Sequence, residues 1–294
     1  MLGREIGGRR NLAAARRKAC LTDSARVSGL TTAPLAYGNR PMSPRKITAG
    51  SFLQSPTHPE LEGQRVFLAG ISDGTGEAIA RVFAQQGTRL VLHSRQEAAR
   101  ATALADGVAP IAAGLRFFSG DIASDQAACE RLSRAGLGAY GGVDLLINFV
   151  TLPRAEADAG RDADDIEQRV ADALRPALVL GRSVADHARN SGQPATVIHV
   201  SLARSGRAAA FASYAMLKAG LEAMAQDQAR RWFSHDVCVY AFVPGLPDES
   251  YADDELANVV PARSNFDASL WAILLNAASG RSRWLNGVTV AVPE

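Results

Sequence analysis

Short runs of hydrophobic residues alternate with longer amphipathic stretches from residue 61 to the C-terminus. The runs are continuously apolar, as in parallel strands that are covered on both faces. The stretches between them are rich in alanine and repeat their apolar positions with the period of a helix. We expect strands at 66–69, 89–93, 115–118, 143–147, 196–200, 237–243 and 288–292, and helices near 75–87, 96–106, 124–136, 163–190, 211–234 and 265–279. This alternation predicts one doubly wound α/β domain with a seven-stranded parallel sheet over residues 61–294.

Residues 1–60 lack this periodicity. They are rich in Arg, Gly, Ser and Thr and carry ten Lys and Arg against three Asp and Glu. Such a segment buries too little apolar surface to offset its ordering entropy, so we expect a basic, disordered extension before the domain. Three alternatives stay open: a translation start at Met42, an organellar targeting segment, and a basic arm that touches nucleic acid or membrane.

Charge and cysteine content bear on partners and location. Residues 61–294 hold 22 basic and 27 acidic side chains, so the domain has no electrostatic footprint for nucleic acid. No apolar run approaches the ~18 residues that cross a bilayer. Cys20, Cys129 and Cys238 form no CxxC pair, and the histidines complete no metal-ligand spacing. We expect a cytoplasmic protein without nucleic-acid, membrane or metal partners, and leave organellar targeting open.

A glycine-rich turn follows the first predicted strand and precedes a helix. Glycines permit close backbone approach to a phosphate, and the helix N-terminus offers unpaired N–H groups and a positive dipole end. In this strand–loop–helix context the turn predicts a dinucleotide site. Its candidate binding residues are Gly70, Ser72, Asp73, Gly74, Thr75 and Gly76.

The end of the second predicted strand indicates which dinucleotide is preferred. In folds that use NAD, an acidic residue about 20 positions after the glycines holds the ribose 2′-hydroxyl. Here the strand ends in His93-Ser94-Arg95, and no carboxylate lies between Glu77 and Glu97. An arginine pairs well with a 2′-phosphate. Ser94 and Arg95 therefore favour NADP(H), with NAD(H) still possible.

Three side chains further along have the chemistry of a proton-transfer site. Tyr214 and Lys218 lie four residues apart in a predicted helix and hence on one face. A tyrosine hydroxyl, with an ordinary pKa of about 10, needs a nearby cation to act near neutral pH. Lys218 is the only lysine among residues 61–294, which hold 21 arginines, and an ammonium differs from a guanidinium at such a site. Ser201 follows the fifth strand, at the edge where doubly wound sheets bind ligands.

Together these motifs resemble the short-chain dehydrogenase/reductase family over essentially all of residues 61–294. The thirteen-residue gap from Ser201 to Tyr214 is the family's usual one. Further matches are Asp121 and Ile122 after strand three, Asn148 at the end of strand four, and Pro244-Gly245 after strand six. The resemblance implies a Rossmann-like fold, a homodimer or homotetramer, and an NADP(H)-dependent oxidoreductase that interconverts a carbonyl and an alcohol.

The resemblance also implies roles for individual residues. Tyr214 would be the general acid/base, and Lys218 would stabilise its anion and hold the nicotinamide ribose. Ser201 would orient the substrate carbonyl, and Asp121 would reach the adenine. The other cofactor contacts would come from the glycine turn, from Ser94 and Arg95, and from Ile122, Asn148, Pro244 and Gly245.

Several departures from the family pattern support an alternative function. Asn148 is followed by Phe149-Val150-Thr151, which is bulkier than the family's Asn-Ala-Gly. The helix asparagine that anchors a relay water in the family is expected at Leu174. After Pro244-Gly245, Pro247 has no N–H to donate. The alternative is a non-catalytic homologue that acts as a dinucleotide-binding sensor or scaffold. The sequence does not identify the substrate.

Overall fold

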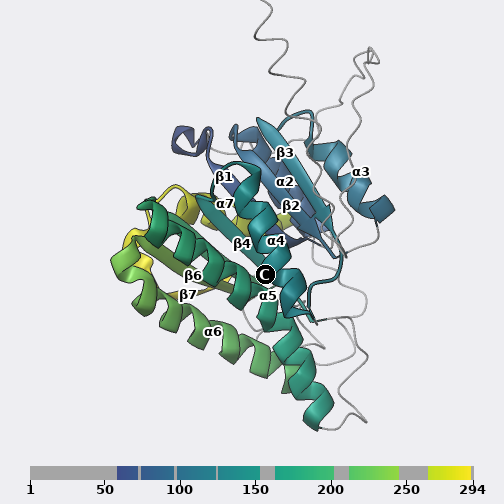
Figure 1. The fold of residues 1–294 in the computed structure, drawn as a ribbon, viewed down its shortest axis with the longest axis vertical. Coiled ribbons are helices and arrows are strands. Elements are labelled where there is room, and N and C mark those ends of the chain that lie inside the picture. The colour runs from purple at the N-terminus through teal and green to yellow at the C-terminus, as the bar shows by residue number, and fades with distance from the viewer. Residues whose placement is uncertain are drawn as a thin grey trace, which may run out of the picture.

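The computed structural model describes residues 58–71, 74–95, 98–123, 125–152, 163–201, 212–244 and 264–292. These residues contain seven strands in one parallel sheet with the order β3-β2-β1-β4-β5-β6-β7 (Figure 1). The strands are β1 (Arg65–Ile71), β2 (Arg89–Ser94), β3 (Gly114–Ser119), β4 (Leu145–Val150), β5 (Ala195–Ser201), β6 (Val237–Pro244) and β7 (Thr289–Val292). The predicted doubly wound, Rossmann-like sheet is therefore confirmed.

Helices cover both faces of the sheet, which explains why its strands read as continuous apolar runs. One face packs against α2 (Gly74–Gln85), α3 (Ala98–Val108) and α7 (Ser264–Ala278). The other packs against α4 (Gln126–Ala139), α5 (Ala163–Ser191) and α6 (Ala212–Trp232). Three short 3-10 helices complete the described chain: η1 (Pro59–Leu61), η3 (Phe233–His235) and η4 (Arg283–Leu285).

Successive residues of a strand point to opposite faces of the sheet, where they pack in two separate hydrophobic cores. Leu68 of β1 and Ile147 of β4 are fully buried beneath α2 and α7, in one cluster with Phe83. Phe67 and Leu146, one position earlier on the same strands, are buried beneath α4 and α5. The alternation fixes the register of the sheet, because a slip by one residue would exchange the two faces.

Strand β4 differs from its predicted range of 143–147. Asp144 lies before the strand, where its carboxylate accepts a hydrogen bond from the Arg65 backbone N–H at 2.8 Å and pairs with the Arg65 guanidinium. The ladder with β5 instead continues to Val150, which pairs with Ser201. Asn148 therefore lies inside β4, two residues before its end, and was wrongly expected to end it.

The described chain begins just before the predicted domain boundary at residue 61. The backbone N–H of His58 donates to Gln86 Oε1 at 2.8 Å, immediately after α2, and Leu61 is fully buried. Residues 58–60 therefore contact the domain. The rest of the expected extension, residues 1–57, lies outside the described residues.

Candidate functional site

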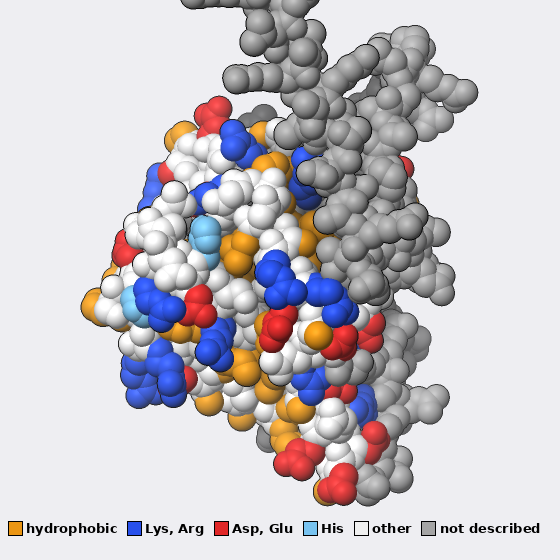
Figure 2. All heavy atoms as spheres, viewed as in Figure 1, with side chains coloured by type: hydrophobic (Ala, Val, Ile, Leu, Met, Phe, Trp, Pro, Cys, Tyr) orange, Lys and Arg blue, Asp and Glu red, His pale blue; other side chains and the backbone are white. Residues whose placement is uncertain are grey.

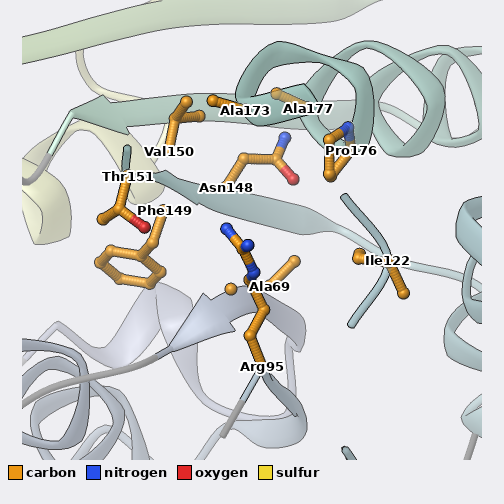
Figure 3. A pocket seen from close by; sticks show the side chains of 11 residues that line it. Ala69, Arg95, Ile122, Asn148, Phe149, Val150, Thr151, Ala173, Pro176 and Ala177 are labelled. Carbon is orange, nitrogen blue, oxygen red and sulfur yellow. The ribbon is translucent and has the colours of Figure 1, made fainter. Parts of the chain in front are cut away.

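The strand order of the sheet reverses between β1 and β4, the position where doubly wound sheets hold ligands. A pocket lies there, bounded by β1, β2, β4, the segment after β3 and α5 (Figure 3). Its lining residues are Ala69, Gly70, Arg95, Ile122, Asn148, Phe149, Val150, Thr151, Ala173, Pro176 and Ala177. Four predicted cofactor residues, Gly70, Arg95, Ile122 and Asn148, thus meet at one pocket although they come from four parts of the chain.

Two glycines of the predicted turn are required by the geometry. Gly70 has a φ of +85°, and a Cβ there would lie 2.6 Å from the Phe149 carbonyl oxygen. A Cβ at Gly76 would lie 2.4 Å from Ile71 Cγ2. The absence of side chains lets β1 pass close to β4 and lets the first turn of α2 lie against the end of β1.

The remainder of the turn is described only in part. Helix α2 begins at Gly74, at the carboxyl edge of the sheet, so its N-terminal N–H groups and positive dipole end lie at the edge where such sheets bind ligands. Thr75 is in this first turn. Ser72 and Asp73 lie outside the described residues.

Arg95 and Asp121 form an ion pair at the pocket. Arg95 points from the end of β2 toward Asn148 (Figure 3). Its Nε lies 3.3 Å from Asp121 Oδ1, and the same Asp121 oxygen accepts a hydrogen bond from the Ala123 backbone N–H at 3.0 Å. Ser94 is buried at the end of β2, and Ile122 is buried at the pocket wall. The predicted adenine residue and the predicted phosphate residue therefore contact each other.

The role of His93 was not predicted from the sequence: this residue links the glycine turn to the segment that follows β3. It is fully buried, its Nδ1 accepts from the Gly70 backbone N–H at 3.3 Å, and its Nε2 donates to the Gly120 carbonyl at 2.9 Å. Both partners fix the neutral tautomer with the proton on Nε2. Burial lowers the pKa of His93 to about 4. A histidine in an otherwise apolar strand was the available signal.

A second buried histidine was also missed. His199 of β5 lies beside Asn148 of β4 in the ladder, and both side chains are buried. The Asn148 amide Nδ2 donates to His199 Nδ1 at 3.3 Å, and His199 Nε2 donates to Gln228 Oε1 of α6 at 2.8 Å. The polar chain therefore runs from the pocket through the sheet to α6.

The three predicted catalytic residues come from β5 and α6. Ser201 is the last residue of β5 and pairs with Val150, a pocket residue. Its Oγ is buried and has no hydrogen-bond partner among the described residues. Tyr214 and Lys218 lie one turn apart near the start of α6, with Tyr214 buried and Lys218 half-buried. Each is thus at or beside the carboxyl edge of the sheet.

The structure describes the surroundings of Leu174, the expected position of the family's helix asparagine. Leu174 packs toward α6, where a Cβ on Gly220 would lie 2.9 Å from its Cδ1. The α5 residues that border the pocket are Ala173, Pro176 and Ala177. The expectation that Leu174 occupies the position of the family's helix asparagine stays a prediction.

The remaining predicted residues follow β6. Pro244 ends this strand. Gly245 and Pro247 lie outside the described residues. Among the described residues, no three His, Cys, Asp or Glu side chains gather as a metal site would require, and no helix is long and apolar enough to cross a membrane.

Comparison with known proteins decides the family. The family described as short chain dehydrogenase matches residues 64–257, about two thirds of the chain. The chain belongs to this family. This match confirms the resemblance inferred from the motifs. The short-chain dehydrogenases are oxidoreductases.

Characterised relatives are distant. A 3β-hydroxysteroid dehydrogenase of Eggerthella lenta is 29% identical over 209 residues, which are 67% of this chain and 78% of that protein. An L-rhamnose 1-dehydrogenase (NAD(P)(+)) of Azotobacter vinelandii is 29% identical over 198 residues, 66% of this chain and 77% of that protein. Among solved structures, a short-chain dehydrogenase/reductase from Serratia marcescens has a TM-score of 0.64 at 22% identity, covering 80% of this chain and 98% of its own. The structural likeness supports the fold of the family.

Proposed function

We propose that this protein is an NADP(H)-dependent oxidoreductase that interconverts a carbonyl and an alcohol with Ser201, Tyr214 and Lys218. The observation that carries the proposal is the Ser201 hydroxyl, which is buried beside the pocket and lacks a hydrogen-bond partner in the described residues. A buried hydroxyl without a partner is costly, and a bound carbonyl oxygen would satisfy it.

The described residues fit a dinucleotide. A Cβ on Gly70 would fill the close passage between β1 and β4, and Asn148 Oδ1 is a buried acceptor without a partner in the described part of the pocket. The proposed phosphate contacts are the backbone N–H groups that open α2 and the Arg95 guanidinium. Ser72, Asp73 and Gly245 lie outside the described residues and are proposed on the family motif alone.

The chemistry divides between the cofactor and the protein. The nicotinamide, when bound, supplies the hydride for reduction and accepts it for oxidation. In the direction of reduction, the Tyr214 hydroxyl gives its proton to the carbonyl oxygen as the carbon gains the hydride, so the product is the alcohol. The Ser201 hydroxyl donates a hydrogen bond to the same oxygen. The positive charge of Lys218, one turn along α6, stabilises the Tyr214 phenolate that remains.

Turnover and binding are measured separately to test this. NADPH oxidation across a panel of ketones and ketoacyl thioesters should give activity that Tyr214→Phe abolishes and Lys218→Ala lowers, with NADPH affinity retained in Tyr214→Phe. Tyr140→Phe is a matched control, because this half-buried tyrosine follows α4 outside the pocket. Turnover that survives Tyr214→Phe would contradict the assignment, and NADPH binding without turnover on any carbonyl would favour the sensor or scaffold alternative.

Assembly and compartment form the last part of the proposal. We propose a homo-oligomer that meets through α5 and α6, because these helices expose the apolar side chains of Leu178 and Met216. Figure 2 shows basic and acidic side chains interspersed with apolar ones over the face that α4, α5 and α6 form. The buried thiols Cys129 and Cys238 are unpaired, which supports a reducing compartment such as the cytoplasm. Light scattering after gel filtration measures the assembly.

A further inference from the structure

The pocket is connected to α6 by a row of buried polar side chains, of which the proposed function uses only Asn148. Ala69, Asn148 and His199 are neighbours in register across β1, β4 and β5, and Gln228 reaches this row from α6. Asn148, His199 and Gln228 are each less than 4% exposed. Polar groups in such a core are costly unless each is hydrogen-bonded, so their retention calls for a reason.

The row ends in an acceptor that faces the pocket. The Asn148 NH2 group donates to His199 Nδ1, so Asn148 Oδ1 points the other way, into the cavity (Figure 3). This oxygen is buried and has no hydrogen-bond partner among the described residues. Arg95, whose guanidinium only donates, points into the same cavity from the opposite wall. A carbonyl oxygen is therefore favoured over an NH2 group at this position.

The orientation of the Asn148 amide depends on the proton of His199. With the proton on Nε2, His199 donates to Gln228 Oε1 and leaves Nδ1 to accept from Asn148. With a proton on Nδ1, the histidine would donate there instead, and the amide would turn its oxygen inward and its NH2 group toward the pocket. Gln228 presents its Oε1 to His199, while its Nε2 has no hydrogen-bond partner among the described residues; in this arrangement the His199 tautomer determines which end of the Asn148 amide a ligand meets.

We propose that His199 and Gln228 are positioning residues that hold Asn148 Oδ1 toward the pocket, where it accepts a hydrogen bond from a hydroxyl or amino group of the bound dinucleotide. The inference rests on the proposed cofactor function and adds to it two residues outside the glycine turn and the Ser201-Tyr214-Lys218 set. Neither residue touches the ligand, and both act through Asn148.

The surroundings of His199 make it neutral in the native protein. It is enclosed by β4, β6, α5 and α6, and its ladder neighbours are Asn148 and Ala241. Burial lowers the pKa of His199 to about 4, while the Gln228 hydrogen bond acts in the opposite direction. No charged side chain among the described residues contributes to this pKa. Above pH 6 the amide orientation should therefore not depend on pH.

Gln228→Glu tests the positioning role through pH. The new carboxylate favours the uptake of one proton by the carboxylate–His199 pair. If the proton is on the histidine, both ring nitrogens donate; if it is on the carboxyl, which then donates to Nε2, the ring proton is on Nδ1. In both cases Nδ1 becomes a donor. The Asn148 amide then turns its NH2 group toward the pocket beside Arg95. The expected result, by fluorescence titration of the full chain with NADPH, is a ratio of variant to wild-type Kd near one at pH 8.5. That ratio should rise about 3- to 10-fold by pH 6, the value of one hydrogen bond.

Gln86→Glu is the matched control, because Gln86 is also buried and its Oε1 also accepts a hydrogen bond, yet it follows α2 at the opposite edge of the sheet. Its ratio of Kd values should stay flat over the same pH range. A flat ratio for Gln228→Glu, or an equal rise in Gln86→Glu, overturns the positioning role alone. A wild-type protein that binds neither NADPH nor NADH overturns the proposed function as well.

A measurement on the unmodified protein keeps the proposal testable if the buried glutamate prevents folding. Long-range ¹H–¹⁵N correlation spectra distinguish the two neutral tautomers of an assigned histidine. We expect His199 to carry its proton on Nε2 at pH 7.5. A proton on Nδ1 would mean that the Asn148 NH2 group faces the pocket, and would overturn the inference.

Discussion

The Arg95 guanidinium and the Asp121 carboxylate lie 3.3 Å apart at the pocket, so the side chain proposed to hold a phosphate is already paired with an anion. Arg95 is about one quarter exposed and Asp121 is more than half exposed, which keeps the pair weak and exchangeable. A cofactor phosphate carries more charge than the carboxylate and would displace it. Asp121 would then be released toward the other polar groups of the ligand.

Arg95→Ala should therefore weaken NADPH binding about tenfold or more and leave NADH binding nearly unchanged. The reason is the loss of a charge-assisted hydrogen bond to the 2′-phosphate, about 1.5–3 kcal/mol. Titration with both nucleotides measures the ratio. Arg231→Ala removes an equally charged but exposed side chain at the far end of α6 and serves as the control. Equal affinity of the wild-type protein for NADPH and NADH would contradict the preference.

Gly70→Ala should abolish cofactor binding and destabilise the fold. The methyl group would lie 2.6 Å from the Phe149 carbonyl, and the φ of +85° is itself strained for alanine. The expected loss of unfolding free energy is about 2 kcal/mol or more. Gly63→Ala has a similar φ of +75° but nothing within 4 Å of its Cβ, so it should cost about 1 kcal/mol and leave binding intact. Urea denaturation of both variants distinguishes the cost of the steric clash at position 70 from the cost of backbone strain alone.

Ala173→Asn should raise the single-turnover rate of carbonyl reduction, whereas Leu174→Asn should not. Of the two residues, Ala173 borders the pocket and Leu174 does not, so an amide at position 173 is the one that can reach a ligand bound there. An increase of about tenfold is expected, a fraction of the 100- to 1000-fold typical of one catalytic hydrogen bond. Leu174→Asn should instead lower stability by about 1–2 kcal/mol, because it disrupts the contact with Gly220. The reverse ranking of the two rates would show that the face of α5 is assigned incorrectly.

Acid should destabilise the protein through its two buried histidines. Burial lowers the pKa of His93 and of His199 to about 4, below the ordinary value of 6.5, so the unfolded chain binds protons that the native state does not. Stability is therefore complete above about pH 6.5 and falls as the pH drops toward 4. Between pH 7.5 and 5 each histidine should remove about 2 kcal/mol of unfolding free energy. Urea denaturation should show that the free energy of unfolding depends less on pH in His93→Gln than in the wild-type protein. An unchanged pH dependence would contradict the assignment.

The fold was predictable because its signals are local and repeated. Each strand of the sheet carries an apolar run on both faces, and each helix between strands has its own periodicity, so the seven predicted strands recur in order. The end of β4 was less predictable, since Asp144 is taken out of the strand by Arg65, a partner 79 residues away. Contacts of that range leave no pattern in the local sequence.

The residues of the candidate site were likewise predictable only in part. Gly70, Asn148 and Ser201 lie at or near the carboxyl ends of their strands and Arg95 follows β2. These strand ends lie at one edge of a parallel sheet, so their proximity was foreseeable. The histidines were missed because their partners are backbone groups or amides from other elements, such as Gly120 and Gln228. Such partners are brought together only by the folded chain.

Leu174 of α5 packs closely against Gly220 of α6, within the larger contact between the two helices. Gly220 lies two residues after Lys218 on α6, and Leu174 adjoins Ala173 on α5, so the pair sets the separation between the pocket wall and the helix of the proposed acid/base. Any side chain at position 220 would need a smaller partner at 174 to keep that spacing. The two positions should therefore vary together among descendants of this protein, and a lineage that enlarged one without trimming the other would be expected to bind a differently shaped substrate.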